Sequence, residues 1–270
     1  MQKRFLGIMV ASVLLAVVFI ACKDDDKDKE KVDGEITSFT VNGVSFDMVF
    51  VKGGTFTMGA AEDDADAYEW EKPAHQVTLS DFSIGKFEVT QKLWKTVMGD
   101  NPSLSKGDNL PVETVSWEDT QEFITKLNAA TGKKFRLPTE AEWEYVARGG
   151  NKSKGYKYCG SNDIDAVAWY VDNSESKTHT VGTKAANELG IYDMSGNVLE
   201  WCNDWYDVYT TDTQTDPQGA VSGSDSVLRG GGWGSRSQGC RVSFRHKYTP
   251  GYHFSGYGFR LSLVSEKNIM

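Results

Sequence analysis

The segment RGGGWGSRSQGCRVSFR, residues 229–245, joins a run of glycines to one cysteine and is the first place to look for chemistry. A cysteine thiolate is a strong nucleophile, so Cys240 is a candidate catalytic residue. Cys240 could equally be one half of a disulfide bond that holds a loop-rich domain together. The reactivity of a single cysteine cannot be read from its own position, so the choice between these two roles depends on the rest of the sequence.

The N-terminus predicts export from the cytoplasm. Lys3 and Arg4 precede a nearly unbroken apolar run over residues 5–20, which is typical of a secretory signal and short for a membrane span. The run ends before Cys22 and resembles a bacterial lipoprotein signal, in which that cysteine is acylated and becomes the mature N-terminus. We therefore expect a signal peptide over residues 1–21. An ordinary cleaved signal that happens to contain a cysteine is the alternative.

Residues 23–33, KDDDKDKEKVD, are charged at every position but one and cannot bury apolar surface. We expect the lipid-anchor cysteine and a charged, solvated tether over residues 22–37. The charged run also resembles the acidic export tag of surface-exposed lipoproteins, which predicts an outer-membrane lipoprotein at the cell surface. A plain spacer between lipid and domain remains the alternative.

Charge and length limit what the rest of the chain can be. Removing residues 1–21 takes away Lys3 and Arg4 and no acidic residue, so the net charge falls from −9 to −11. An acidic chain without a basic run is repelled by phosphate backbones, so we expect no nucleic-acid partner. Residues 38–265 are enough for one large domain with a substantial core.

The local patterns of this domain predict an α+β fold. Residues 39–58 and 75–89 alternate apolar and polar side chains around tight turns, which predicts short strands. In the second stretch the candidate inward-facing residues are Val77, Leu79, Ile84, Phe87 and Val89. Cap residues predict three helices, over residues 90–99, 116–132 and 139–150. After residue 150 we expect short strands and long loops held by buried aromatic rings.

Five segments, in order, resemble the formylglycine-generating enzyme family, also called the sulfatase-modifying-factor family. They are MVFVKGGTFTMG (48–59), KFEVTQKLW (86–94), FRLPTEAEWEYVARGG (135–150), GIYDMSGNVLEWCNDWY (190–206), and VLRGGGW (227–233) with GFRL (258–261). The resemblance covers nearly all of residues 38–265. It implies a single compact, loop-rich domain related to C-type-lectin-like folds.

Enzymes of this family resemble one another in using two cysteines and copper(I) to oxidise a sulfatase cysteine to formylglycine. Counting from Arg229, the family's serine matches Gly232, its first catalytic cysteine matches Ser235 and its second matches Cys240. A serine hydroxyl is a hard, weak ligand and cannot replace a thiolate for copper(I). Counting from Arg245 leaves Cys240 outside the second position altogether. Copper is therefore expected only if the protein is catalytic.

The missing thiol favours a structural role for Cys240. If the segment carrying Cys202 packs beside the glycine-rich loop, Cys202 and Cys240 could form a disulfide bond, which leaves Cys159 free. A buried reduced pair is the alternative.

The family resemblance also implies a structural calcium site. Its positions match Asp193, Gly196, Val198 and Glu200, where two side chains and two backbone carbonyls would supply oxygen ligands. In the alternative, Asp193 caps a turn and Glu200 pairs with an arginine such as Arg229 or Arg241. No iron site is expected, because the four histidines show no ligand spacing and are typical of surfaces and turns; they are His75, His179, His246 and His253.

We therefore expect a non-catalytic binding or assembly module in a lipoprotein, with an envelope protein, a peptide or a glycan as its partner. Exposed aromatic residues in TPGYHFSGY, residues 249–257, could form the contact surface. The first alternative is the copper-dependent oxidase of sulfatases. The second is another reaction in the same cleft, with Arg236, Arg241 and Arg245 holding an anionic substrate.

Overall fold

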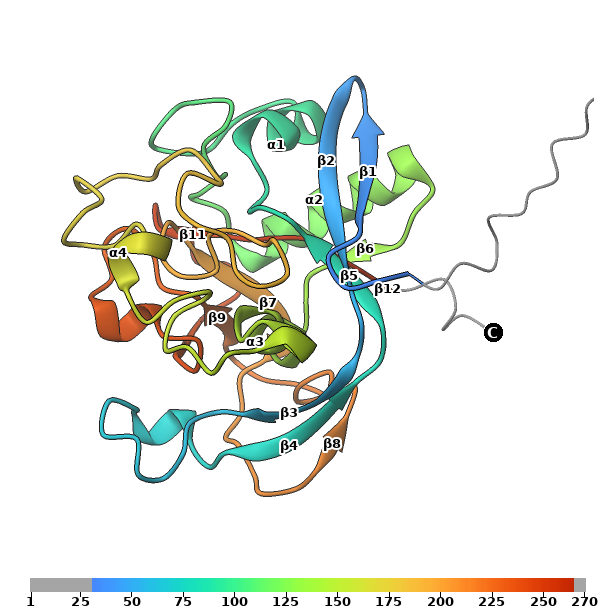
Figure 1. Cartoon of the computed structure of the whole chain (residues 1–270). Coiled ribbons are helices and arrows are strands. Elements are labelled where there is room, and N and C mark those ends of the chain that lie inside the picture. The colour runs from blue at the N-terminus through green and yellow to red at the C-terminus, as the bar shows by residue number, and fades with distance from the viewer. Residues whose placement is uncertain (1–30, 265–270) are drawn as a thin grey trace, which may run out of the picture. The chain divides into compact units, whose positions relative to one another are not determined.

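The computed structural model describes residues 31–264 (Figure 1). Cys22, the signal peptide and most of the expected tether lie outside the described residues. Regular structure begins at Ile36, two residues before the expected domain start. Within residues 31–264, no helix has both the length and the apolar character needed to cross a membrane.

The largest sheet has five strands and contains both the first and the last strand of the described chain. Its strands, in spatial order, are β1 (Ile36–Val41), β2 (Val44–Val51), β5 (Phe82–Gly85), β12 (Ser262–Val264) and β6 (Phe135–Arg136). All neighbouring strands are antiparallel. Asn42 and Gly43 connect β1 to β2 with φ angles of 45° and 80°, the left-handed pair that a two-residue hairpin turn requires.

Two smaller sheets complete the β structure. The four-stranded sheet contains β10 (Arg245–Tyr248), β9 (Ser226–Arg229), β7 (Leu199–Trp205) and β11 (Tyr257–Gly258). The three-stranded sheet contains β3 (Gly54–Met58), β4 (His75–Leu79) and β8 (Gln214–Thr215). The three-stranded sheet lies at the lower end of the view in Figure 1. Helix α3 (Glu140–Ala147) contacts β3, β4 and β7, so it connects this sheet to the four-stranded one.

The three predicted helices form with the predicted caps. Thr90 and Ser116 accept hydrogen bonds at the starts of α1 (Gln91–Met98) and α2 (Trp117–Thr131), and left-handed glycines end both helices. Thr139 and Glu142 form the capping box of α3. The remaining short elements are η1 (Glu69–Glu71), η2 (Gly150–Lys152), α4 (Ile164–Val167) and η3 (Ser237–Cys240).

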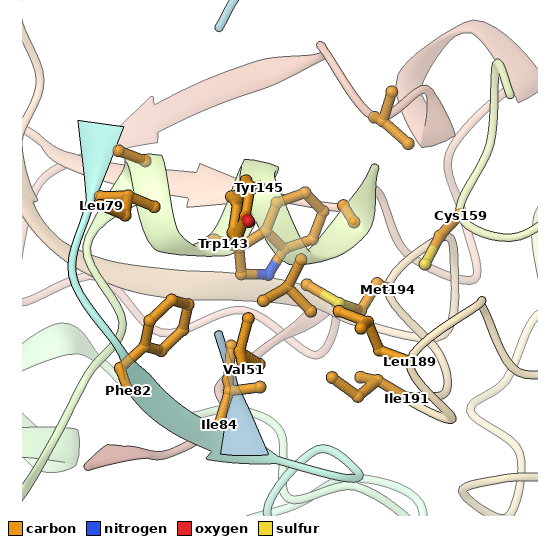
Figure 2. Close-up of a cluster of buried hydrophobic side chains, with 14 of the residues drawn as sticks. Val51, Leu79, Phe82, Ile84, Trp143, Tyr145, Cys159, Leu189, Ile191 and Met194 are labelled. Carbon is orange, nitrogen blue, oxygen red and sulfur yellow. The ribbon is translucent and has the colours of Figure 1, made fainter. Parts of the chain in front are cut away.

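Helix α3 is buried at every position and fills the centre of the domain. Figure 2 shows Trp143 and Tyr145 of this helix facing Val51, Phe82 and Ile84 of the large sheet. A second core cluster lies under α1 and α2, where the Trp94 and Phe123 rings stack 5.2 Å apart. The expected α+β class, with helices early and short strands and loops late, is confirmed.

One predicted core position is wrong. Val77, Leu79, Ile84 and Val89 are buried, but Phe87 is only half-buried. Strand β5 ends at Gly85, so the period-two alternation does not continue to Phe87. The Phe87 ring packs on Tyr192 with centroids 5.2 Å apart, and Glu88 is buried instead.

Candidate functional site

Cys240 lies inside the domain, at the end of η3. Its side chain is fully buried in a small cluster with Tyr158, Tyr170 and two aliphatic residues. Gly231 packs directly against it, and a Cβ atom at Gly231 would lie 2.8 Å from the Cys240 sulfur. Burial raises the pKa of the Cys240 thiol to about 12, so it stays protonated near neutral pH. These features are those of a packed core thiol rather than of an exposed nucleophile, and a catalytic role for Cys240 stays a prediction.

The expected disulfide bond between Cys202 and Cys240 is not present. Cys159, Cys202 and Cys240 are all free and buried. Cys202 belongs to the core cluster around α3, whereas Cys240 belongs to the separate cluster with Tyr170. Burial raises the pKa of the Cys202 thiol well above its usual value. The alternative of buried reduced thiols therefore describes this structure, and apolar packing takes the place of the cross-link.

Ser235 lies at an open cleft rather than in the core. The cleft has a volume of about 260 Å³, and its ring-bearing residues, which we call the aromatic cleft, are Trp233, Phe244, His246, Phe254 and Tyr257. The Ser235 hydroxyl accepts a hydrogen bond from the Gly232 amide at 2.9 Å. No thiol lines this cleft in the described part of the chain.

The residues expected to bind calcium lie in a buried ionic network. Both oxygens of Glu200 accept hydrogen bonds from Arg260, at 2.6 and 2.7 Å, and one also accepts from the Trp143 indole at 2.8 Å. Asp193 accepts from the Gly182 amide at 2.6 Å. Glu200 therefore pairs with an arginine, as in the alternative, but the arginine is Arg260 rather than Arg229 or Arg241.

Glu88 is a member of this network that the sequence did not reveal. Its carboxylate accepts from the Val198 amide at 3.1 Å and from the Asn197 side chain at 2.6 Å. Burial raises the pKa of Glu88 well above its usual value, and the nearby Asp193 and Glu200 raise it further. Burial also raises the pKa of Asp193 to about 6.

Three other arginines are fully buried and are held by glutamates. Arg241 pairs with Glu71 at 2.6 Å, Arg245 pairs with Glu140 at 2.6 Å, and Arg229 pairs with both Glu140 and Glu144. These contacts take up the guanidinium groups expected to hold an anionic substrate. Arg236, the other candidate, is exposed on the surface. Within residues 31–264, the three buried arginines therefore have structural glutamate partners.

Comparison with known proteins identifies this architecture. The family model for the sulfatase-modifying factor enzyme 1-like domain matches residues 34–264. The chain belongs to this family. It is 38% identical over 258 residues to Chaperone protein LppX of Paenibacillus barcinonensis, across 76% of this chain and 85% of that protein. It is 28% identical over 286 residues to the formylglycine-generating enzyme of Thermomonospora curvata, across 79% and 92% of the two chains.

A solved structure supports the same fold for the sulfatase-modifying-factor domain. Treponema denticola variable protein 1 superposes with a TM-score of 0.79 at 34% identity, and the match covers 85% of this chain and 99% of that one. The domain is therefore a compact, loop-rich member of this family in both sequence and three-dimensional structure.

The residues expected to bind calcium fit such an ion only in part. Arg260 already neutralises Glu200, and burial raises the pKa of both Glu88 and Asp193, which favours their neutral forms. Both Glu200 oxygens already hold hydrogen bonds. Among residues 31–264, no three acidic, histidine or cysteine side chains converge as a metal cage. Asp193 and the backbone carbonyls of Gly196 and Val198 remain as the expected calcium ligands.

Proposed function

We propose that this protein is a cell-envelope lipoprotein whose sulfatase-modifying-factor domain is a non-catalytic binding or assembly module. The observation that carries the proposal is the composition of the aromatic cleft. Ser235 stands there in place of a thiol, and Cys240 is buried outside the cleft. Membership of the family supplies the fold, and the chemistry of a site has to come from its own residues.

The aromatic cleft suits a protein or peptide partner. The Trp233 indole is fixed by a 2.9 Å hydrogen bond to the Ser255 carbonyl, so the ring is held in place before any ligand arrives. Phe254, from the predicted contact loop, is 44% exposed and packs against Tyr257 with centroids 5.1 Å apart. Rigid aromatic side chains at an open cleft are typical anchors for apolar groups of a partner. The chaperone name of the LppX relative supports an assembly role.

A site-specific cross-linking experiment tests this function. A photo-reactive amino acid at Phe254 should cross-link the protein to an envelope partner in intact cells, and a Trp233→Ala substitution should abolish the adduct. The same reagent at Leu104, which is exposed but does not line the cleft, is the matched control. Equal adducts from both positions would refute the cleft as the binding surface.

We propose that Cys22 anchors the protein by lipid at the outer membrane, on the cell surface. A Cys22→Ser substitution should move the protein from the membrane fraction to the soluble fraction. External protease should digest the wild-type protein in intact cells. Unchanged membrane attachment of Cys22→Ser would contradict the anchor.

A further inference from the structure

A second cleft lies at the start of α3 and shares no residue with the aromatic cleft. It has a volume of about 510 Å³. Its walls come from the three-stranded sheet, the start of α3 and the end of β7 with the loop that follows. We call it the His75–Asp204 cleft, and its lining includes Met58, His75, Glu140, Asp204, Tyr209 and Arg245.

Two buried polar side chains in this cleft have an atom without a protein partner. Asp204 is 4% exposed, and its Oδ2 accepts a 2.9 Å hydrogen bond from the Glu140 amide. Its Oδ1 receives no hydrogen bond from residues 31–264. His75 is also 4% exposed, and its Nδ1 lies 3.2 Å from the Pro73 carbonyl oxygen. Its Nε2 likewise has no partner in the described chain, which corrects the expectation of a surface or turn histidine.

Among residues 31–264, no cation forms an ion pair with Asp204. Arg245, which also lines the cleft, is held by both oxygens of Glu140 at 2.8 and 2.6 Å, and it donates to the Asp207 carbonyl at 2.9 Å. Its guanidinium also packs on the Tyr209 ring, 3.8 Å from the ring centroid. A buried carboxylate without a cationic partner is costly, so it either takes up a proton or binds a positively charged ligand.

We propose that the His75–Asp204 cleft binds a primary ammonium group, supplied by a lysine side chain of a partner or by a free polyamine. Asp204 Oδ1 is a single acceptor, because Oδ2 is already used by the α3 amide. One acceptor suits the compact charge of an ammonium, whereas a guanidinium is best matched by two parallel oxygens. His75 Nε2 offers a second acceptor when the ring is neutral. Met58 and Ala141 give the aliphatic stem of such a ligand an apolar wall.

The acid–base surroundings of Asp204 make this binding depend on pH. The charged and titratable groups around it are Glu140, Glu142, Arg136, Arg245 and Cys202, with His75, Asp207 and Tyr209 elsewhere in the cleft wall. Burial raises the pKa of Asp204 to about 8, and Glu140 raises it as well. The ligand binds the ionised carboxylate, so affinity for an amine should increase about tenfold between pH 7 and pH 9 as Asp204 loses its proton.

The experiment is a calorimetric titration of the full chain with two probes, Nα-acetyl-lysine methylamide and spermidine. We expect at least one probe to bind, more tightly at pH 9 than at pH 7, and the tighter probe identifies the source of the ammonium. Asp204→Asn should abolish binding, whereas Asp212→Asn, which removes the same charge outside the cleft, should leave it unchanged. Nε-acetylation of the lysine probe should also abolish binding.

A second variant guards against a folding defect in Asp204→Asn. Thr215 is exposed on β8 and lines the cleft, so Thr215→Lys places a competing ammonium there without touching Asp204. It should weaken binding of either probe at least tenfold. The proposal is overturned if neither probe binds, if the acetylated probe binds equally well, or if both Asp204→Asn and Thr215→Lys bind like the wild type. This cleft is independent of the aromatic cleft, so failure here leaves the proposed function intact.

Discussion

Asp204 should make the stability of the domain depend on pH in a way that one substitution removes. Its pKa is raised from 3.8 to about 8, first by burial and then by Glu140. In the unfolded chain an aspartate has a pKa of about 3.9, so between about pH 4 and pH 8 the folded state keeps a proton that the unfolded state releases. The free energy of unfolding therefore falls as pH rises through this window. The full loss is on the order of 5 kcal/mol.

Asp204→Asn tests this reasoning, because asparagine keeps an acceptor for the Glu140 amide and cannot ionise. The free energy of unfolding of both proteins should be measured in urea at pH 5, 7 and 9. Between pH 5 and pH 9 it should fall by at least about 2 kcal/mol less in Asp204→Asn than in the wild type. Asp193, whose pKa is raised to about 6, and Glu88 lower stability with pH in both proteins, so the difference between the curves isolates Asp204. Asp212→Asn should run parallel to the wild type. If the free energy of unfolding of Asp204→Asn depends on pH as that of the wild type does, the pKa of Asp204 is not raised.

Three other predictions follow from the buried residues. Glu140→Gln removes the carboxylate shared by two buried arginines and should lower the free energy of unfolding by about 3–5 kcal/mol in urea titrations. Glu122→Gln, in an exposed ion pair, should change it by less than about 0.5 kcal/mol, and equal losses would contradict the buried network. A thiol reagent should modify none of the three buried cysteines in the native protein and all three in denaturant; rapid native labelling would contradict their packing. Calcium should raise the unfolding temperature relative to a chelator, and Asp193→Asn should remove that increase; no increase in the wild type would exclude the ion.

The local structure could be predicted from the sequence because its signals are short-range. The caps at Thr90, Ser116 and Thr139 act within four residues, and the Asn42–Gly43 turn is set by its own backbone angles. The failure at Phe87 has the same origin, since nothing nearby in the sequence shows that β5 ends at Gly85.

The sites depend on partners far apart in the chain. Glu88 meets Val198, Arg260 meets Glu200, and Asp204 meets the start of α3, across separations of 110, 60 and 64 residues. No spacing rule predicts such pairs, so the sequence cannot identify Arg260 as the partner of Glu200, and it predicts a surface or turn position for His75, which is buried. The family motifs identify the positions at which calcium is expected and Ser235, but they do not show which carboxylates a buried arginine already binds.

The wrong expectation for Cys202 and Cys240 has a related cause. Cysteine counting gives the number of possible bridges but not the direction in which each side chain points. Cys202 faces the core around α3 and Cys240 packs under Gly231, so the two thiols belong to different clusters. Among the described residues, the odd number of cysteines reflects buried apolar packing rather than an unfinished disulfide framework.

If the aromatic cleft has no thiol chemistry, the protein should not oxidise a peptide substrate of the family's enzymes. The purified protein, supplied with copper(I) and oxygen, is incubated with a peptide that contains a sulfatase cysteine motif, and mass spectrometry follows conversion of the cysteine to formylglycine. A formylglycine-generating enzyme of the same family is the positive control. With Ser235 at the cleft and Cys240 buried, we expect the peptide to remain unconverted. Conversion at a rate comparable with the control would contradict this expectation and make the protein an oxidase.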